Sequence, residues 1–156
     1  MKQASQLTDE QSGFQVDALT YDGRNVLHVA AERGHLEVCR WIMETYADTV
    51  RPDACNEQGQ TLVHFASRSG NLDLLKFVVQ HWEQDAAAPP IMSTINSCAH
   101  SPLFSATSSN NVEVVRYLVD EHGADVKELS VSNLRYVACA LLGHSVPHLL
   151  TSPVRC

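Results

Sequence analysis

The sequence LEVCRWIM at residues 36–43 returns as LDLLKFVV at 72–79 and as VEVVRYLV at 112–119. Each copy reads apolar, acidic, apolar, apolar, basic, aromatic, apolar, apolar. In an α-helix, the acidic and basic residues three positions apart share one exposed face. The remaining apolar residues cover too much of the circumference for a helix that packs on one side only. We therefore expect each copy to form a helix that lies between neighbours in a stack.

A related block precedes each of these helices. The blocks read NVLHVAAERGH at 25–35, TLVHFASRSGN at 61–71 and SPLFSATSSNN at 101–111. Their first residues, Asn25, Thr61 and Ser101, are suited to cap a helix N-terminus. Gly34 and Gly70 stand where the first helix must end, because glycine adopts the left-handed conformation without strain. The repeated unit is therefore a short helix, a tight turn, a longer helix and an extended connection.

These units resemble ankyrin repeats. The family's signature T-P-L-H-x-A-A-x-x-G-H appears at 25–35 with its first two positions changed, and again at 61–66 and 101–106. The family's ending G-A-D-V stands at 123–126. The resemblance covers roughly residues 20–150. It implies an all-α ankyrin-repeat solenoid of helix-turn-helix repeats with hairpin-like fingers.

The repeats also predict how the chain is divided. Three recognisable repeats are expected at about 20–55, 56–95 and 96–128, followed by a degenerate fourth at 129–156, all within one domain at 20–156. Residues 1–19 are expected to form a leader or partial N-terminal cap. The connection from Gln84 to Ser97 is longer than the standard spacing gives, and Pro89-Pro90 forbids a helix there. We predict that this connection projects as a long finger.

Composition excludes several classes of protein. Eleven Lys and Arg against eighteen Asp and Glu leave a net charge of −7, which argues against binding of nucleic acid. No apolar run approaches the roughly 18 residues of a membrane span, so membrane insertion is not expected. The N-terminus lacks the apolar core of a secretion signal. Five cysteines without a C-x-x-C pair indicate free thiols in a reducing compartment. These features predict a monomeric cytoplasmic protein, with the nucleus as the alternative location.

Eight histidines prompt a search for metal or catalytic sites. His28 and His64 match the signature histidine, whose ring in the ankyrin family bonds backbone groups and braces the turns. His144 and His148 lie four apart, but Pro147 separates them and no third ligand is near. The motifs of serine hydrolases, phosphate-binding loops and zinc proteases do not occur. We predict no catalysis, no metal and no cofactor; an enzyme would require a cluster around Cys139 and His144.

Trp41, Phe77 and Tyr117 occupy one equivalent position on the second helices. A ladder of aromatic rings for a stacked ligand is one interpretation. Core packing between adjacent units is the one we favour, because apolar residues flank the position in every copy.

The resemblance implies a groove lined by finger tips and by the exposed ends of the first helices. The residues predicted to bind a partner there are Tyr21, Asp22, Arg24, Glu32, Arg33, Glu57, Gln58, Gln60, Arg68, Ser69, Ser97, Cys98, His100, Ser108, Ser109, Leu141 and Leu142. Arg24, Arg33 and Arg68 favour a protein or peptide partner with acidic groups, because arginine pairs carboxylates with two bonds. Leu141 and Leu142 replace polar residues of the earlier units. They therefore require a cover, which could be residues 151–156, further chain or a second protein.

The function predicted from the sequence is a non-catalytic protein–protein interaction module that uses its concave surface. The alternative is a regulatory or targeting ankyrin fragment of a larger enzyme or channel whose activity lies outside this chain.

Overall fold

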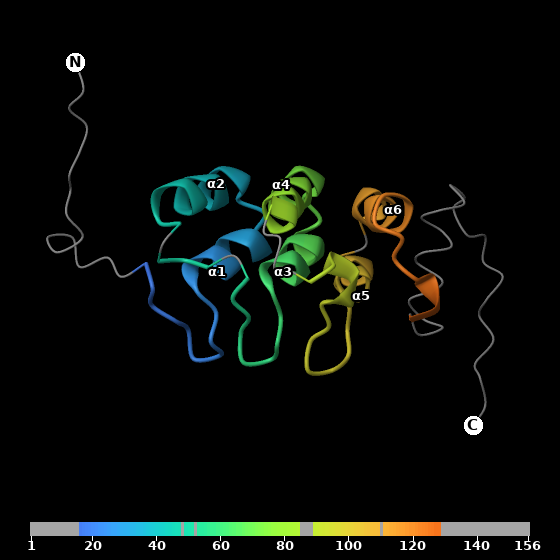
Figure 1. Cartoon of the computed structure of the whole chain (residues 1–156), viewed down its shortest axis with the longest axis horizontal. Helices are drawn as coiled ribbons and strands as arrows, with labels where there is room; N and C mark the ends of the chain where they lie inside the picture. The colour runs from blue at the N-terminus through green and yellow to red at the C-terminus, as the bar shows by residue number, and fades with distance from the viewer. Residues whose placement is uncertain (1–15, 48, 52, 85–88, 110, 129–156) are drawn as a thin grey trace, which may run out of the picture.

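The computed structural model describes residues 16–47, 49–51, 53–84, 89–109 and 111–128. Its α-helices are α1 (Val26–Glu32), α2 (Leu36–Thr45), α3 (Leu62–Ser69), α4 (Leu72–Gln84), α5 (Pro102–Ser108) and α6 (Val112–Asp120). Two 3₁₀ turns, η2 (Ile91–Ser93) and η3 (Val126–Glu128), complete the elements of the described residues. Figure 1 shows α1, α3 and α5 in an inner layer and α2, α4 and α6 in an outer layer. This arrangement confirms the predicted all-α stack of helix pairs. Residues 1–15 of the predicted leader (1–19) and the whole of the predicted fourth repeat lie outside the described residues.

The helix ends follow the local signals in the sequence. Asn25 Oδ1 accepts a hydrogen bond from the His28 N–H at 2.9 Å, and Ser101 Oγ accepts one from the Phe104 N–H at 3.4 Å. Gly34 and Gly70 end the inner helices with φ of 75° each. Each cap satisfies a backbone donor that has no partner inside the helix, which is why these residues define the boundaries.

The core runs between the two layers and from one repeat to the next. The α3 residues from Leu62 to Ser67 are all buried, because α1 and α5 flank this helix and α4 covers it. Leu74, Leu75 and Val78 bury the inward face of α4. A single repeat cannot cover its own apolar faces, so the neighbours supply the core, as in other solenoids.

The described part of the connection between α4 and α5, residues 89–101, does not form a long finger, so that prediction was wrong for these residues. The helix α4 itself has 13 residues against 10 in α2. Trp82 near its end is buried, and its Nε1 donates a hydrogen bond to the Pro89 carbonyl at 2.8 Å. Ile91 of η2 is buried as well. These parts of the connection lie against the stack because a projecting finger would leave both apolar side chains in water.

Fingers of similar size project from the inner layer, at 17–25, 54–61 and 94–101 (Figure 1). An asparagine braces the second and third fingers in the same way. Asn56 Oδ1 accepts hydrogen bonds from the Gln58 and Gln60 N–H groups at 3.1 and 2.8 Å. Asn96 Oδ1 accepts from Cys98 and His100, both at 2.9 Å. These side-chain bonds add to the backbone bonds across each finger, where the Asn56 N–H donates to the Gln60 carbonyl and the Asn96 N–H donates to the His100 carbonyl, both at 3.0 Å.

Backbone hydrogen bonds join each finger to the next. The Glu57 N–H donates to the Asp22 carbonyl at 3.1 Å, and the Ser97 N–H donates to the Gln58 carbonyl at 2.8 Å. Gly23 permits the first contact, since an added Cβ would lie 3.1 Å from the Glu57 nitrogen. The fingers therefore form one continuous row.

Ala99 stands where the first two fingers have glycine. Its φ is 58°, close to the 77° of Gly23 and the 72° of Gly59. A residue with a side chain is destabilised in this left-handed conformation by about 1–2 kcal/mol. Glycine avoids that strain, but its more flexible unfolded chain lowers stability by about 0.4–1 kcal/mol. We expect Ala99→Gly to raise the free energy of unfolding by about 0.5–1 kcal/mol in urea denaturation.

Ala54→Gly provides the control, since Ala54 has no positive φ. This change should lower stability, because glycine then brings only its greater freedom in the unfolded chain. Equal effects of the two substitutions would show that the conformation of Ala99 carries no strain.

Candidate functional site

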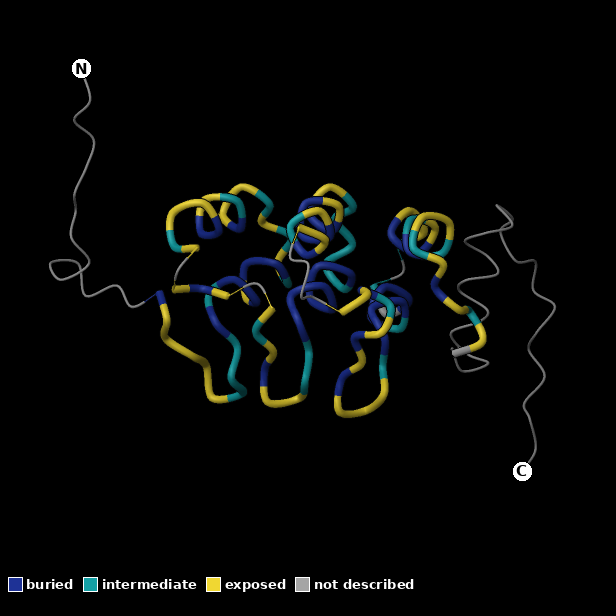
Figure 2. The backbone as a smooth tube through the Cα atoms, in the orientation of Figure 1, coloured by how far each residue is buried: buried dark blue, intermediate teal, exposed yellow. Residues whose placement is uncertain are grey.

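The row of finger tips is largely exposed, as Figure 2 shows by colour. Tyr21 at the first tip is 92% exposed. Glu57 and Gln58 at the second tip and Ser97 and Cys98 at the third are also exposed. All five are among the residues that the sequence predicts to face a partner. Backbone hydrogen bonds join their fingers while these side chains reach solvent, so the tips present side chains from a fixed scaffold.

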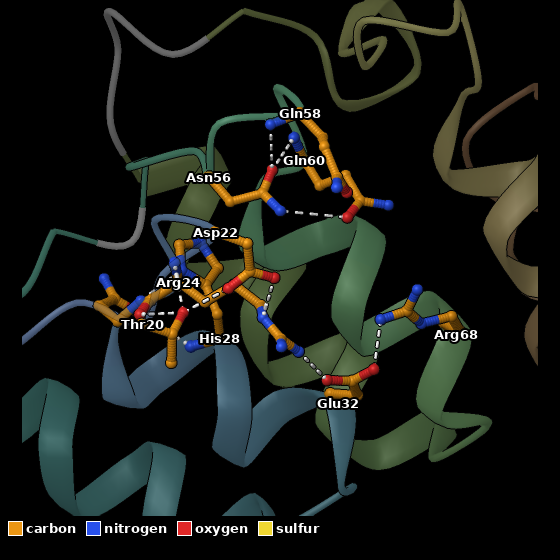
Figure 3. Close-up of polar contacts among 10 residues, drawn as sticks. Thr20, Asp22, Arg24, His28, Glu32, Asn56, Gln58, Gln60 and Arg68 are labelled. Carbon is orange, nitrogen blue, oxygen red and sulfur yellow. Dashed lines mark hydrogen bonds and ion pairs between the residues drawn. The ribbon is translucent and has the colours of Figure 1, made fainter.

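Ion pairs link the first finger to the inner helices (Figure 3). Arg24 Nε lies 2.7 Å from Asp22 Oδ2, and its Nη1 lies 2.6 Å from Glu32 Oε2 at the end of α1. The other oxygen of Glu32 pairs with Arg68 of α3. We call the contacts of Glu32 with the two arginines the Arg24–Glu32–Arg68 bridge. It joins repeat one to repeat two across the surface predicted to bind a partner.

The Asp22–Arg24 pair and the Arg24–Glu32–Arg68 bridge together balance the charges of these four side chains. The Thr20 hydroxyl, which donates to the Asp22 carboxylate, and the neighbouring Arg24 hold the pKa of Asp22 below its usual value. Asp22 in turn raises the pKa of Arg24. The carboxylates of Asp22 and Glu32 thus balance the charges of the Arg24 and Arg68 guanidinium groups. Arg33 is exposed at the end of α1 and takes part in none of the ion pairs found in the part of the chain that the structure describes.

His28 and His64 fasten the inner helices to the fingers. The His28 Nδ1 accepts a hydrogen bond from the Asn25 N–H at 3.2 Å, and its Nε2 lies 3.1 Å from the Ala54 carbonyl. His64 repeats both contacts, with the Thr61 N–H at 3.2 Å and the His100 carbonyl at 3.1 Å. Both rings are buried, so a neutral ring with hydrogen on Nε2 satisfies all of these groups. The predicted bracing role is confirmed.

Stability should fall at mildly acidic pH because of these two rings. Burial is the main cause that lowers the pKa of both His28 and His64 from the usual 6.5. The unfolded chain therefore binds protons that the folded chain does not, so stability is complete above about pH 6.5 and decreases as the pH falls below it. We expect the urea midpoint to decrease between about pH 7 and pH 5.5.

Comparison with His28→Gln isolates the contribution of one ring. This variant should show a shallower dependence on pH over the same range, because one of the two buried rings that resist protonation has been removed. A slope identical to that of the parent chain would mean that other groups cause the dependence.

Several other predicted site residues are used inside the fold. The Ser69 hydroxyl donates to the Ala66 carbonyl, and the Ser109 hydroxyl donates to the Ala106 carbonyl, both at 2.7 Å. The Gln60 side chain accepts a hydrogen bond from Asn56 at 3.3 Å. The His100 ring stacks on the Phe104 ring, with centroids 3.6 Å apart. The Ser108 side chain, Leu141 and Leu142 lie outside what the structure describes.

A model of ankyrin repeats in many copies matches residues 27–79, and an ankyrin repeat model matches residues 98–128. Together they cover more than half of the chain. The chain belongs to the ankyrin repeat family. A search of the curated proteins found no match to this ankyrin-repeat chain.

Ankyrin repeats are generally protein–protein interaction modules, and ankyrin-repeat domains are typically non-catalytic. In the described part of this ankyrin stack, no group of three or more His, Cys, Asp or Glu residues is placed to hold a metal ion. None of the described helices is long and apolar enough to cross a membrane. Burial raises the pKa of Cys39 to about 11, which keeps this thiol protonated near neutral pH. The predicted alternatives at Cys139, His144 and His148 fall outside the described residues.

Contacts between ankyrin repeats include some that sequence reasoning missed. Asn71 Nδ2 donates to the Gly34 carbonyl at 2.9 Å, and Asn111 Nδ2 donates to the Gly70 carbonyl. Both asparagines stand at the start of an outer helix, just after the turn that ends an inner one, and this repeated position is the signal that could have found them. The braces Asn56 and Asn96 were missed too, although both stand three residues before the left-handed position of their finger.

Proposed function

We propose that this ankyrin-repeat domain is a non-catalytic module that binds another protein or a peptide on the concave surface formed by its fingers and inner helices. The observation that carries the proposal is the hydrogen-bonded row of finger tips. Tyr21, Glu57, Gln58, Ser97 and Cys98 lie exposed on that row, and none of the ion pairs or side-chain hydrogen bonds found in the described residues uses their side chains. A tyrosine on a fixed backbone loses little entropy on binding, which favours recognition at this surface.

The bridge changes how an acidic partner would bind. Arg24 and Arg68 already hold Glu32, so an incoming carboxylate would have to replace Glu32 between them. Such an exchange conserves the number of ion pairs and therefore supplies selectivity more than affinity. The exposed Arg33 is a cation on this surface that a partner can reach without breaking an ion pair of the described fold.

A capture experiment tests the proposed surface. The full chain and the variant Tyr21→Ser/Gln58→Ala would be immobilised, exposed to cell extract and compared by quantitative mass spectrometry. We expect proteins retained by the parent chain to fall at least about tenfold with the variant, because tyrosine is among the residues that dominate binding energy. A second variant, Arg33→Ala, should selectively reduce partners with acidic binding segments.

The matched control alters exposed polar residues of the outer layer. Gln80→Ala/Asp120→Ala changes as many side chains on α4 and α6 and should retain the same proteins as the parent chain. Equal loss in the control and the finger-tip variant would locate binding elsewhere, and unchanged retention by the finger-tip variant would contradict the proposal.

A further inference from the structure

Cations and aromatic rings alternate along the outer layer of the stack. The guanidinium carbon of Arg40 in α2 lies 4.9 Å from the centroid of the Phe77 ring in α4. Lys76 Nζ in α4 lies 5.6 Å from the centroid of the Tyr117 ring in α6. In both cases the cation belongs to one repeat and the ring to the next repeat along the chain. Such contacts attract because the face of an aromatic ring is negative.

Trp41 holds the same position in α2, at the first helix pair of the described stack (Figure 1). Trp41 is 51% exposed, against 9% for Phe77. Its ring meets Tyr46 edge-on with centroids 5.5 Å apart, and none of the cation–aromatic contacts found between residues 16 and 128 includes it. In the described residues Trp41 is thus not packed between units, contrary to the prediction, whereas its counterpart Phe77 is buried as predicted.

Two valines extend the exposed surface around Trp41. Val38 is 44% exposed, whereas its counterparts Leu74 and Val114 are both fully buried at 0%. Val29 of α1 is exposed, whereas its counterpart Phe65 in α3 is buried. We call Val29, Val38 and Trp41 the end face. In the second repeat, where α1 and α2 precede, the equivalent residues Phe65, Leu74 and Phe77 are buried.

Charges beside the end face favour a cationic group on an incoming partner. Glu37 and Glu44 lie four residues before and three residues after Trp41, so they share its side of α2. Both are exposed. Glu37 is 3.8 Å from Arg40, and Glu44 forms none of the ion pairs found in the described residues. A lysine or arginine brought to Trp41 would thus also meet carboxylates.

We propose that the end face binds a helix of another protein, which places a lysine or arginine over Trp41 and apolar side chains on Val38 and Val29. The register of the repeats argues against the chain itself as the source of that cation. In the sequence, Ala4 stands 36 residues before Arg40, and Leu149 stands six residues after Gly143, as Arg40 does after Gly34. Neither residue carries a charge. The site is separate from the finger tips and does not depend on their function.

A pair of peptides tests the proposal. The probe is a fluorescein-labelled, helix-stapled peptide with the sequence of α4, residues 72–84, because that helix places Lys76 over a ring in the fold. The control peptide carries Lys76→Gln. We expect the lysine peptide to bind the full chain about 2–5-fold more tightly in fluorescence anisotropy, as a partly exposed cation–aromatic contact predicts. Trp41→Leu in the protein should abolish the difference between the two peptides.

A control variant checks that the peptide binds at the end face. Ile95→Ala removes an exposed apolar side chain of the third finger and should leave both affinities unchanged. Failure of the lysine peptide to bind, or equal affinity of the two peptides for the parent chain, would overturn the proposal. It would also be overturned if the peptide bound only after removal of residues 1–15, or if sedimentation showed self-association that Trp41→Leu abolishes. Those results would identify the N-terminal segment or a second copy as the occupant.

Discussion

Phe65→Ala is expected to lower the free energy of unfolding by about 3–5 kcal/mol, the range typical of a buried phenylalanine. Phe65 is 1% exposed at the centre of the stack, where its ring contacts the His28 ring with centroids 5.0 Å apart. The guanidinium carbon of Arg68 lies 5.2 Å from the centroid of the Phe65 ring. Alanine would leave a cavity beside α1 and α3 that the packed helices cannot fill by moving.

Val29→Ala is the matched control because Val29 holds the same position one repeat earlier. Its side chain is 37% exposed, so truncation removes little buried area and should cost less than about 1 kcal/mol. Urea denaturation followed by circular dichroism measures both values. Similar losses in the two variants would mean that position within the repeat, and not burial by neighbours, determines the effect.

His64→Ala is expected to cost about 3 kcal/mol and to loosen the third finger. The substitution leaves the Thr61 N–H and the His100 carbonyl without their partner, and each unsatisfied buried group costs about 1–3 kcal/mol, partly relieved by entering water. Amide hydrogen exchange should be faster at 94–101 than in the parent chain, because the His64 ring bonds the base of this finger to α3.

His100→Ala tests whether the ring or the backbone matters at that contact. The bond from His64 goes to the backbone carbonyl of His100, which this change preserves. The substitution removes only the half-buried ring stacked on Phe104, and it should cost less than about 1 kcal/mol. If amide hydrogen exchange at 94–101 were equally fast in the parent chain and in His64→Ala, the His64 ring would not be what holds the third finger.

The helix pairs could be predicted because their signals are local and repeated. Caps such as Asn25 and turn glycines such as Gly34 satisfy backbone groups within a few residues of themselves. The role of His28 and His64 followed from their match to the ankyrin signature, and their Nδ1 bonds stay within one turn of the helix. Trp82 shows where such reasoning fails. Its burial against the stack holds Pro89 close to the core, although the length of this connection and its two prolines suggested a projecting loop.

The sequence predicted which finger-tip residues form the candidate surface. It did not predict which charged side chains of that surface pair with one another. Arg24 and Glu32 are separated by 8 residues along the chain, and Glu32 and Arg68 by 36, so their meeting depends on the distance between stacked helices. No pattern within one repeat reports that distance.

By itself, the sequence determined the repeating unit, its helix boundaries and the caps of its inner helices, since each depends on short-range hydrogen bonds and periodic burial. Only the tertiary structure decided which equivalent residues differ in environment. Trp41 and Phe77 share a sequence position, yet one is exposed and the other is covered by Arg40 and the neighbouring helix. The physical reason is that a residue in a stack is buried by the repeat packed next to it. Whether such a repeat covers a given side is decided by the assembled fold and not by the residue's own repeat.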